Sequence, residues 1–286
     1  MDQIAKLHAL IDEIDKISDD EWMKGLEDRK VKELEFHDRD REHMGSDNQV
    51  DEGTEGDTFE KFYGNKKYYQ IVGRSTSYVK KWIATESKGK VFLDYACGNG
   101  ANARLAASSG AALSLGFDIS GVSVSNAKQF AKEENLENVR FFQADAENTK
   151  LADNSVDAIL CSGMLHHLDL SYAMPELRRI LKPGGKILAV EALDYNPAIK
   201  LYRMVTPAMR TDWEKAHILN LKDITFAKRF FNLGQVKYWH VVGYAAGKFP
   251  ILRPLLDLID RVLEKIPGVR IMSWMFTFEL VKDAEK

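Results

Sequence analysis

The feature of this sequence that most limits its fold is the alternation of short apolar segments with helical segments between Lys90 and Asp194. The apolar segments, which we interpret as five strands, are KVFLDYA, LSLGFDI, VRFFQAD, VDAILCSG and KILAVEAL. The helical segments are ANARLAASS, VSVSNAKQFAKEE and SYAMPELRRIL. Strands that alternate with helices are joined by right-handed crossovers, which produce a parallel sheet with helices on both faces. We therefore predict an α/β fold with a Rossmann-like, doubly wound sheet.

The chain divides into three parts around this alternation: residues 1–60, 61–194 and 195–286. The first part is an acidic helical segment, indicated by apolar residues at helical spacing, namely Ile4, Leu7, Ile11, Ile14 and Ile17. It ends in a Gly/Asp/Glu-rich stretch at 45–58, which we expect to be a flexible loop. A polar-aromatic helix over 65–84 leads into the first strand. The third part joins helical segments, expected to cover a substrate, to two more strands, QVKYWHVVG and IMSWMFTFELVK.

Composition and charge exclude several classes of protein. Of 286 residues, 45% are hydrophobic and the net charge is −3, which is typical of a soluble globular protein and too acidic for non-specific binding of nucleic acid. Two cysteines cannot build a disulfide framework, and no Cys/His pair has zinc-ligand spacing. No secretory signal and no membrane-spanning run is recognisable, so we expect a cytoplasmic protein.

Charge is unevenly distributed along the chain. Residues 1–60 hold 8 basic and 20 acidic side chains, whereas residues 195–286 hold 15 basic and 9 acidic ones. An acidic arm and a basic C-terminal part could attract each other across a cleft, or both could simply be solvated.

A glycine-rich turn and three acidic residues predict a cofactor crevice. The first strand ends in DYACGNG, residues 94–100, and turns directly into a helix whose N-terminus offers free N–H groups. Asp118 ends the second strand, 20 residues after Gly98, where a carboxylate can accept hydrogen bonds from ribose hydroxyls. Asp145 ends the third strand, where it could accept from an adenine amino group. Each acid alone could equally be a turn former, but together they lie at one edge of the sheet.

This set of motifs resembles the class I S-adenosylmethionine-dependent methyltransferases. The matching runs are VFLDYACGNG, FDIS, QADAEN, CSGMLHHL and LKPGGKILAVEAL, which cover about half of the chain, roughly residues 60–194. The LHHL and LKPGG runs look like the ubiquinone/menaquinone-biosynthesis type and related small-molecule enzymes. The resemblance implies a seven-stranded sheet whose last strand is antiparallel, with the helical segment 244–268 inserted between the last two strands.

The resemblance also implies a cofactor, S-adenosylmethionine, which leaves as S-adenosylhomocysteine, and a set of residues that bind it. Asp94, Gly98 and Gly100 would border the methionine portion, next to Ala96, which replaces the first glycine of the dinucleotide-binding pattern. Asp118 and Ile119 would hold the ribose and flank the adenine, while Asp145 and Ala146 would bond the adenine edge. The backbone of Ser162 would lie under the sulfonium. Tyr69 and Arg74, just before the first strand, could reach the cofactor carboxylate.

Methyl transfer from a sulfonium is an in-line displacement, so the protein must align the reactants, exclude water and remove a proton from a hydroxyl acceptor. His166 and His167, after the fourth strand, and His37, in the run EFHDRD, are the candidate bases. Each could instead be a structural or surface histidine. We expect neither a metal nor a covalent intermediate. Candidate substrate residues, which combine aromatic and basic character, are Tyr202, Arg203, Arg210, His217 and His240.

One amphipathic stripe in the C-terminal part is ambiguous. It consists of Leu255, Leu258, Ile259, Val262 and Ile266, with Arg253, Arg261 and Lys265 on other faces. Such a stripe is more often core packing, but it could also touch a membrane surface.

The sequence thus favours a methyltransferase that acts on a small, lipophilic acceptor, with oxygen as the preferred acceptor atom. Two alternatives remain open: a quinone or lipid methyltransferase at a membrane surface, and a non-catalytic, cofactor-binding regulatory protein. A homodimer is compatible with either. A dinucleotide oxidoreductase is disfavoured by the incomplete glycine pattern, and a nucleic-acid base methyltransferase by CSGMLHH after the fourth strand.

Overall fold

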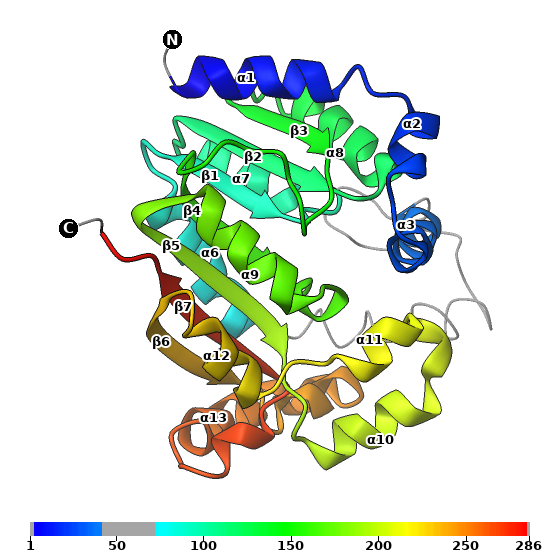
Figure 1. Cartoon of the computed structure of the whole chain (residues 1–286). Coiled ribbons are helices and arrows are strands. Elements are labelled where there is room, and N and C mark those ends of the chain that lie inside the picture. Colours follow the sequence, from blue (N-terminus) through cyan, green and yellow to red (C-terminus); the bar gives the residue numbers. More distant parts are fainter. Residues whose placement is uncertain (1–2, 42–71, 285–286) are drawn as a thin grey trace.

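The computed structural model describes residues 3–41 and 72–284, which form a seven-stranded sheet covered by helices on both faces (Figure 1). The strand order is β3-β2-β1-β4-β5-β7-β6. The strands are β1 (Val91–Tyr95), β2 (Leu113–Asp118), β3 (Val139–Gln143), β4 (Val156–Ser162), β5 (Leu181–Ala192), β6 (Asn232–Trp239) and β7 (Met275–Val281). β7 lies antiparallel between β5 and β6, and the β1 to β5 pairs are parallel. The predicted fold class is therefore confirmed.

Two apolar layers sandwich the sheet because side chains on a strand alternate between its faces. Leu93 and Tyr95 of β1 face a core that includes residues of α1 (Gln3–Ile14), α9 (Leu170–Ile180) and α12 (Leu221–Ala227). Phe92, between them, packs on the opposite face with residues of α6 (Gly73–Glu86) and α7 (Ala101–Ser108). A third cluster joins α7 to α8 (Gly121–Glu133).

The N-terminal part folds as three helices: α1, α2 (Asp19–Lys24) and α3 (Asp28–Arg41). The predicted apolar stripe of α1 contributes Leu7 and Ile11 to the core, so this helix packs on the body. α3 lies at the side of the sheet to which the ends of β2 and β3 point (Figure 1). The predicted loop at 45–58, the start of the predicted helix at 65–84 and Tyr69 lie outside the described residues.

Two helical insertions follow β5. The first, between β5 and β6, contains α10 (Pro197–Val205), a 3₁₀ turn η2 (Pro207–Met209), α11 (Asp212–Ala216) and α12. The second, between β6 and β7, contains η3 (Gly243–Gly247), η4 (Pro250–Leu252), α13 (Arg253–Leu263) and η5 (Arg270–Met272). α10 and α13 lie at the same end of the molecule (Figure 1). No helix within residues 3–41 and 72–284 has the length and hydropathy of a membrane span.

Candidate active site

The turn between β1 and α7 is held in a tight, left-handed conformation. Ala96, Gly98 and Gly100 have φ values of 56°, 52° and 76°. A Cβ on Gly100 would lie 2.5 Å from Cε1 of Phe141, so only glycine fits there. The Gly98 N–H donates to Oδ2 of Asp118 at 2.8 Å, which ties the turn to the end of β2. The sequence prediction of a close-approach turn agrees with this geometry.

Asp94 and Asp118 are buried beside this turn. Asp94 is 1% exposed, and its Oδ2 accepts a hydrogen bond from the Ala103 N–H at 3.2 Å. Burial raises the pKa of Asp94 to about 7. The Asp118 carboxylate also accepts the Ser120 N–H at 3.0 Å, and burial raises its pKa as well. Both acids therefore have structural partners, and both lie at the edge where a cofactor would bind.

A cavity opens at the ends of β1 to β4. Of the predicted cofactor residues, six line it: Ala96, Asp118, Ile119, Asp145, Ala146 and Ser162. Asp94, Gly98 and Gly100 belong to the adjoining turn and are not among the lining residues that the structure describes. His37 and His167, predicted as catalytic candidates, also line this cavity. We call it the cofactor cavity.

Helix α3 forms the outer wall of the cofactor cavity and supplies cations to it. Lys30 Nζ lies 2.7 Å from Oδ2 of Asp145 and 2.9 Å from Oε2 of Glu147, and Arg29 lies 2.6 Å from Glu147. Burial alone would lower the pKa of Lys30, but the hydrogen bonds with Asp145 and Glu147 raise it. Among the described residues, these basic side chains of the N-terminal part thus pair with acidic side chains of the core.

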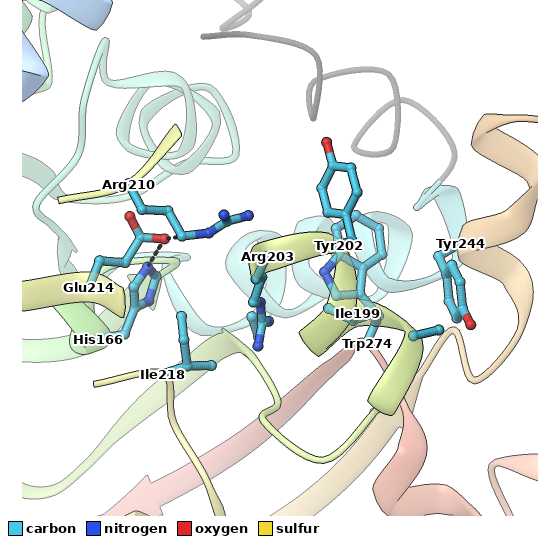
Figure 2. A pocket seen from close by; sticks show the side chains of 11 residues that line it. His166, Ile199, Tyr202, Arg203, Arg210, Glu214, Ile218, Tyr244 and Trp274 are labelled. Carbon is cyan, nitrogen blue, oxygen red and sulfur yellow. Dashed lines mark ion pairs between the residues drawn. The ribbon is translucent and has the colours of Figure 1, made fainter. Parts of the chain in front are cut away.

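A second cavity lies beside α10 and α11 (Figure 2). Its lining is largely apolar and aromatic, and includes Ala192, Ala198, Ile199, Ile218, Tyr244 and Trp274. Of the predicted substrate residues, Tyr202, Arg203 and Arg210 line it, together with His166 and Glu214. Because its lining matches the predicted substrate cover, we call it the acceptor cavity.

Two predicted substrate residues lie elsewhere. His217 stacks on Trp213 with ring centroids 3.9 Å apart, and the structure does not bring it into the acceptor cavity. His240 is buried at the end of β6, where its Nε2 lies 3.0 Å from Oγ of Ser75. Burial, with Arg74 and Arg253 nearby, lowers the pKa of His240 to about 4. Neither position supports the substrate role that we predicted for these two histidines. The sequence placed them in the right segments but could not show which way their side chains point.

Arg74 also lies away from the cofactor cavity. Its guanidinium forms a bidentate ion pair with Glu264, at 2.9 and 2.6 Å, between α6 and the end of α13. Arg74 lines neither the cofactor cavity nor the acceptor cavity among the described residues. The structure therefore gives the predicted cofactor-carboxylate contact of Arg74 no support.

His166 and His167 occupy the wall between the two cavities. They belong to one 3₁₀ turn, η1 (Leu165–His167), and their ring centroids are 4.3 Å apart. Nδ1 of His166 lies 2.6 Å from Oε2 of the fully buried Glu191, whose Oε1 accepts the N–H groups of Met164 and Leu165. This arrangement fixes the imidazole of His166 and leaves its Nε2 on the side of the acceptor cavity.

Glu214 lies next to His166 in the lining of the acceptor cavity (Figure 2). Its Oε1 lies 3.8 Å from Nε2 of His166 and 3.5 Å from Nε of Arg210, as the dashed lines in Figure 2 show. The carboxylate of Glu214 thus lies between the imidazole of His166 and the guanidinium of Arg210, close to both.

His167 is bound to the N-terminal helix. Its Nδ1 lies 2.9 Å from Oε2 of Glu33, and the Thr211 hydroxyl donates to Oε1 of the same carboxylate at 2.5 Å. Burial alone would lower the pKa of His167, but the hydrogen bond with Glu33 raises it. The His37 ring lies 5.0 Å from that of His167. The structure therefore brings together all three histidines predicted as candidate bases.

Two overlapping sets of these side chains could hold a metal ion. The potential ligand atoms of Glu33, His37 and His167 lie within 4.8 Å of one another, as do those of His166, His167 and Glu214. Each set combines two neighbouring side chains of one segment with a third from a distant part of the sequence: Glu33 and His37 with His167, and His166 and His167 with Glu214.

The sequence interpretation missed the acids and cations that position the histidines. Glu191 had a visible signal, a single charged residue inside the apolar segment KILAVEAL. No such signal marked Glu33, Lys30 or Glu214, because charged residues are common in the helical segments to which these three belong.

Comparisons with known proteins agree with this geometry. Residues 93–189 match the family described as "Methyltransferase domain". The uncharacterized methyltransferase YcgJ of Bacillus subtilis is 40% identical over 78 residues, which are 27% of this chain and 31% of that protein. The demethylmenaquinone methyltransferase of a Geobacillus species is 30% identical over 146 residues, 46% of this chain and 60% of that protein. The chain thus spans less than two thirds of the length of either relative.

A solved structure shares the fold. The phosphoethanolamine N-methyltransferase 2 of Haemonchus contortus, in complex with phosphomonomethylethanolamine and S-adenosylhomocysteine, superposes with a TM-score of 0.55 at 19% identity, over 77% of this chain and 57% of that one. Residues 93–189 thus carry a methyltransferase domain, and the strand order and the turn at residues 94–100 resemble those of the class I S-adenosylmethionine-dependent methyltransferases.

Proposed function

We propose that this protein transfers the methyl group of S-adenosylmethionine, bound in the cofactor cavity, to a hydroxyl group of a small lipophilic molecule in the acceptor cavity. The observation that carries the proposal is the junction of the two cavities at η1. His167 lines one cavity and His166 the other, so a donor and an acceptor would meet beside these two rings.

The chain's own residues are suited to direct displacement. The sulfonium of the cofactor is already activated, so the protein has to align the two reactants and receive one proton. His166 is the candidate general base. With Nδ1–H donated to Glu191, its Nε2 can accept the hydroxyl proton, and the Glu191 carboxylate then stabilises the imidazolium. Glu214, 3.8 Å from Nε2, adds a second negative charge beside that imidazolium.

The lining of the acceptor cavity supports the class of acceptor. Ile199, Ile218 and Trp274 offer apolar contact, while Arg203 and Arg210 offer charge to a polar or anionic end of the molecule. Two relatives bear names that fit lipophilic acceptors: the demethylmenaquinone methyltransferase of Geobacillus, and the sterol 24-C-methyltransferase of Aspergillus fumigatus, which is 30% identical over 129 residues. A carbon acceptor is the second candidate, because the names of these two relatives point to quinone and sterol chemistry.

A transfer assay tests the proposal. Cofactor labelled in its methyl group is incubated with a panel of phenols, hydroxyquinones, sterols and long-chain alcohols, and the labelled product is analysed by mass spectrometry. We expect label on oxygen. Replacing His166 by Gln should lower kcat by about 10²- to 10⁴-fold with little change in cofactor affinity. His8→Gln on α1, where the ring contacts Arg140, is the matched control and should retain full activity.

Three outcomes would contradict parts of the proposal. Label recovered on carbon would show that the acceptor atom is carbon, the second candidate, and not a hydroxyl oxygen. Full activity of His166→Gln would show that His166 is not the general base. Tight cofactor binding without transfer to any member of the panel would favour the regulatory alternative.

A further inference from the structure

Helix α13 is packed in the reverse of the usual amphipathic orientation. Its polar side faces the protein: Asp260 is fully buried, with Oδ1 accepting the Val242 N–H at 2.9 Å and Oδ2 accepting the Gly243 N–H at 3.0 Å. Glu264, the residue after the helix, pairs with Arg74 and accepts the His240 N–H at 2.9 Å. The helix is therefore attached to the body by hydrogen bonds and ion pairs.

The apolar side of α13 faces outward. Leu255, Leu258, Ile259 and Val262 occupy positions i, i+3, i+4 and i+7, which form one stripe on a helix, and all four are exposed. Leu258 is 62% exposed and Val262 is 59% exposed. Ile251, 90% exposed, and Ile266 flank the stripe. We call these six residues the apolar face, and their exposure corrects the interpretation of this stripe as core packing.

The charges around the apolar face have one sign. In the insertion between β6 and β7, the exposed charged side chains are Lys248, Arg261, Lys265 and Arg270, all of them basic. The acidic side chains of this insertion point toward partners: Asp260 and Glu264 bind the body, and Asp257 lies 4.0 Å from Arg253. An exposed apolar stripe with a basic margin matches an anionic bilayer surface, where apolar side chains enter the acyl region and basic side chains meet the headgroups.

The insertion that carries the apolar face also contributes to the lining of the acceptor cavity. Tyr244 of the same insertion lines that cavity, and so does α10, through Ile199, Tyr202 and Arg203 (Figure 2). The remaining side of α10 exposes Leu201, Met204 and Val205. α10, which borders the cavity, and α13 lie at the same end of the molecule (Figure 1), and both helices carry exposed apolar side chains.

We propose that the protein docks on anionic phospholipid bilayers through the apolar face of α13 and its basic margin, and that its acceptor enters from the bilayer. Entry of the acceptor from the bilayer rests on the proposed function, whereas the docking itself does not. Such docking would leave the protein peripheral, because the contact involves one helix lying in the membrane interface.

Vesicle sedimentation of the full chain tests the docking. We expect the protein to sediment with vesicles of phosphatidylcholine and phosphatidylglycerol, and much less with phosphatidylcholine alone. The double variant Leu258→Glu/Val262→Glu should lower the partition coefficient by about tenfold or more, and Arg261→Glu/Lys265→Glu should do the same at low salt. Tyr172→Glu, at a 62% exposed position on α9, is the matched control and should sediment like the unchanged protein.

Folding and function are checked separately. Each variant must retain its far-ultraviolet circular dichroism, and vesicle binding is measured without cofactor or acceptor, so the loss of docking and the loss of catalysis can be told apart. Docking would be refuted if the unchanged protein stayed in the supernatant, or if both double variants sedimented as well as the unchanged protein. It would also be refuted by a dimer in light scattering that Leu258→Glu/Val262→Glu converts to a monomer, because a second copy would then cover the face.

Discussion

At the scale of single residues, the acids at the strand ends combine two roles that the sequence analysis had treated as alternatives. Asp118 is a turn former, because it accepts the Gly98 and Ser120 N–H groups, and it also lines the cofactor cavity. Asp94 lies beside the same turn and accepts the Ala103 N–H without lining the cavity, and its burial makes its protonation matter near neutral pH.

The cofactor affinity should depend on pH through Asp94. With its pKa at about 7, the Asp94 carboxyl group is mostly neutral at pH 6 and mostly ionised at pH 8. The methionine portion of S-adenosylmethionine carries cationic groups, which an ionised carboxylate favours. We expect the dissociation constant to rise about tenfold from pH 8 to pH 6, and to change far less in Asp94→Asn. Titrations at pH 6, 7 and 8 measure this, and parallel pH profiles for the two proteins would contradict it.

At the scale of elements, the spacing of apolar residues along the sequence predicted the strands and helices that depend on local pattern. Each of the seven predicted segments contains a strand, and α7, α8 and α9 appear where they were predicted, but β5 begins earlier, at Leu181, and β6 is shifted to Asn232–Trp239. The orientation of α13 was not predictable, because a helical stripe shows that a helix has an apolar side but not which side meets the body. Likewise, the pairing of Lys30 with Asp145 joins residues 115 positions apart, and no local pattern reports such a contact.

His240 joins β6, α6 and the end of α13, and its burial should make this junction sensitive to acid. The folded-state pKa of about 4 lies below the usual value of 6.5, so the unfolded chain takes up the proton first as pH falls. The free energy of unfolding should therefore lose about 2–3 kcal/mol from this residue between pH 6.5 and pH 4.5.

Urea unfolding of the protein and of His240→Asn at pH 7 and pH 4.5 measures this contribution. Asparagine tolerates the positive φ of 65° at this position, so the variant removes the titrating group with little backbone cost. Carboxyl groups titrate in both proteins, and their effect cancels in the difference. An equal loss of stability in the two proteins would show that His240 does not carry the acid sensitivity.

At the scale of the whole molecule, the site is closed by elements from both ends of the chain. α3 brings Glu33 to His167 and to Thr211 at the start of α11, and Arg29 lies 4.4 Å from the centre of the Trp213 ring. The N-terminal helices and the helical insertion after β5 therefore meet above the strand ends. Since Lys30 already pairs with Asp145, a bound adenine must share or displace that cation.

The central claim is that the cavity lined by Asp118 and Asp145 binds S-adenosylmethionine, and calorimetric titration of the purified protein tests it most directly. We predict saturable, micromolar binding of S-adenosylmethionine, no binding of NADH, and a loss of about 1–3 kcal/mol of binding free energy in Asp118→Ala. Binding of NADH alone, or binding of S-adenosylmethionine that Asp118→Ala leaves unchanged, would contradict the account.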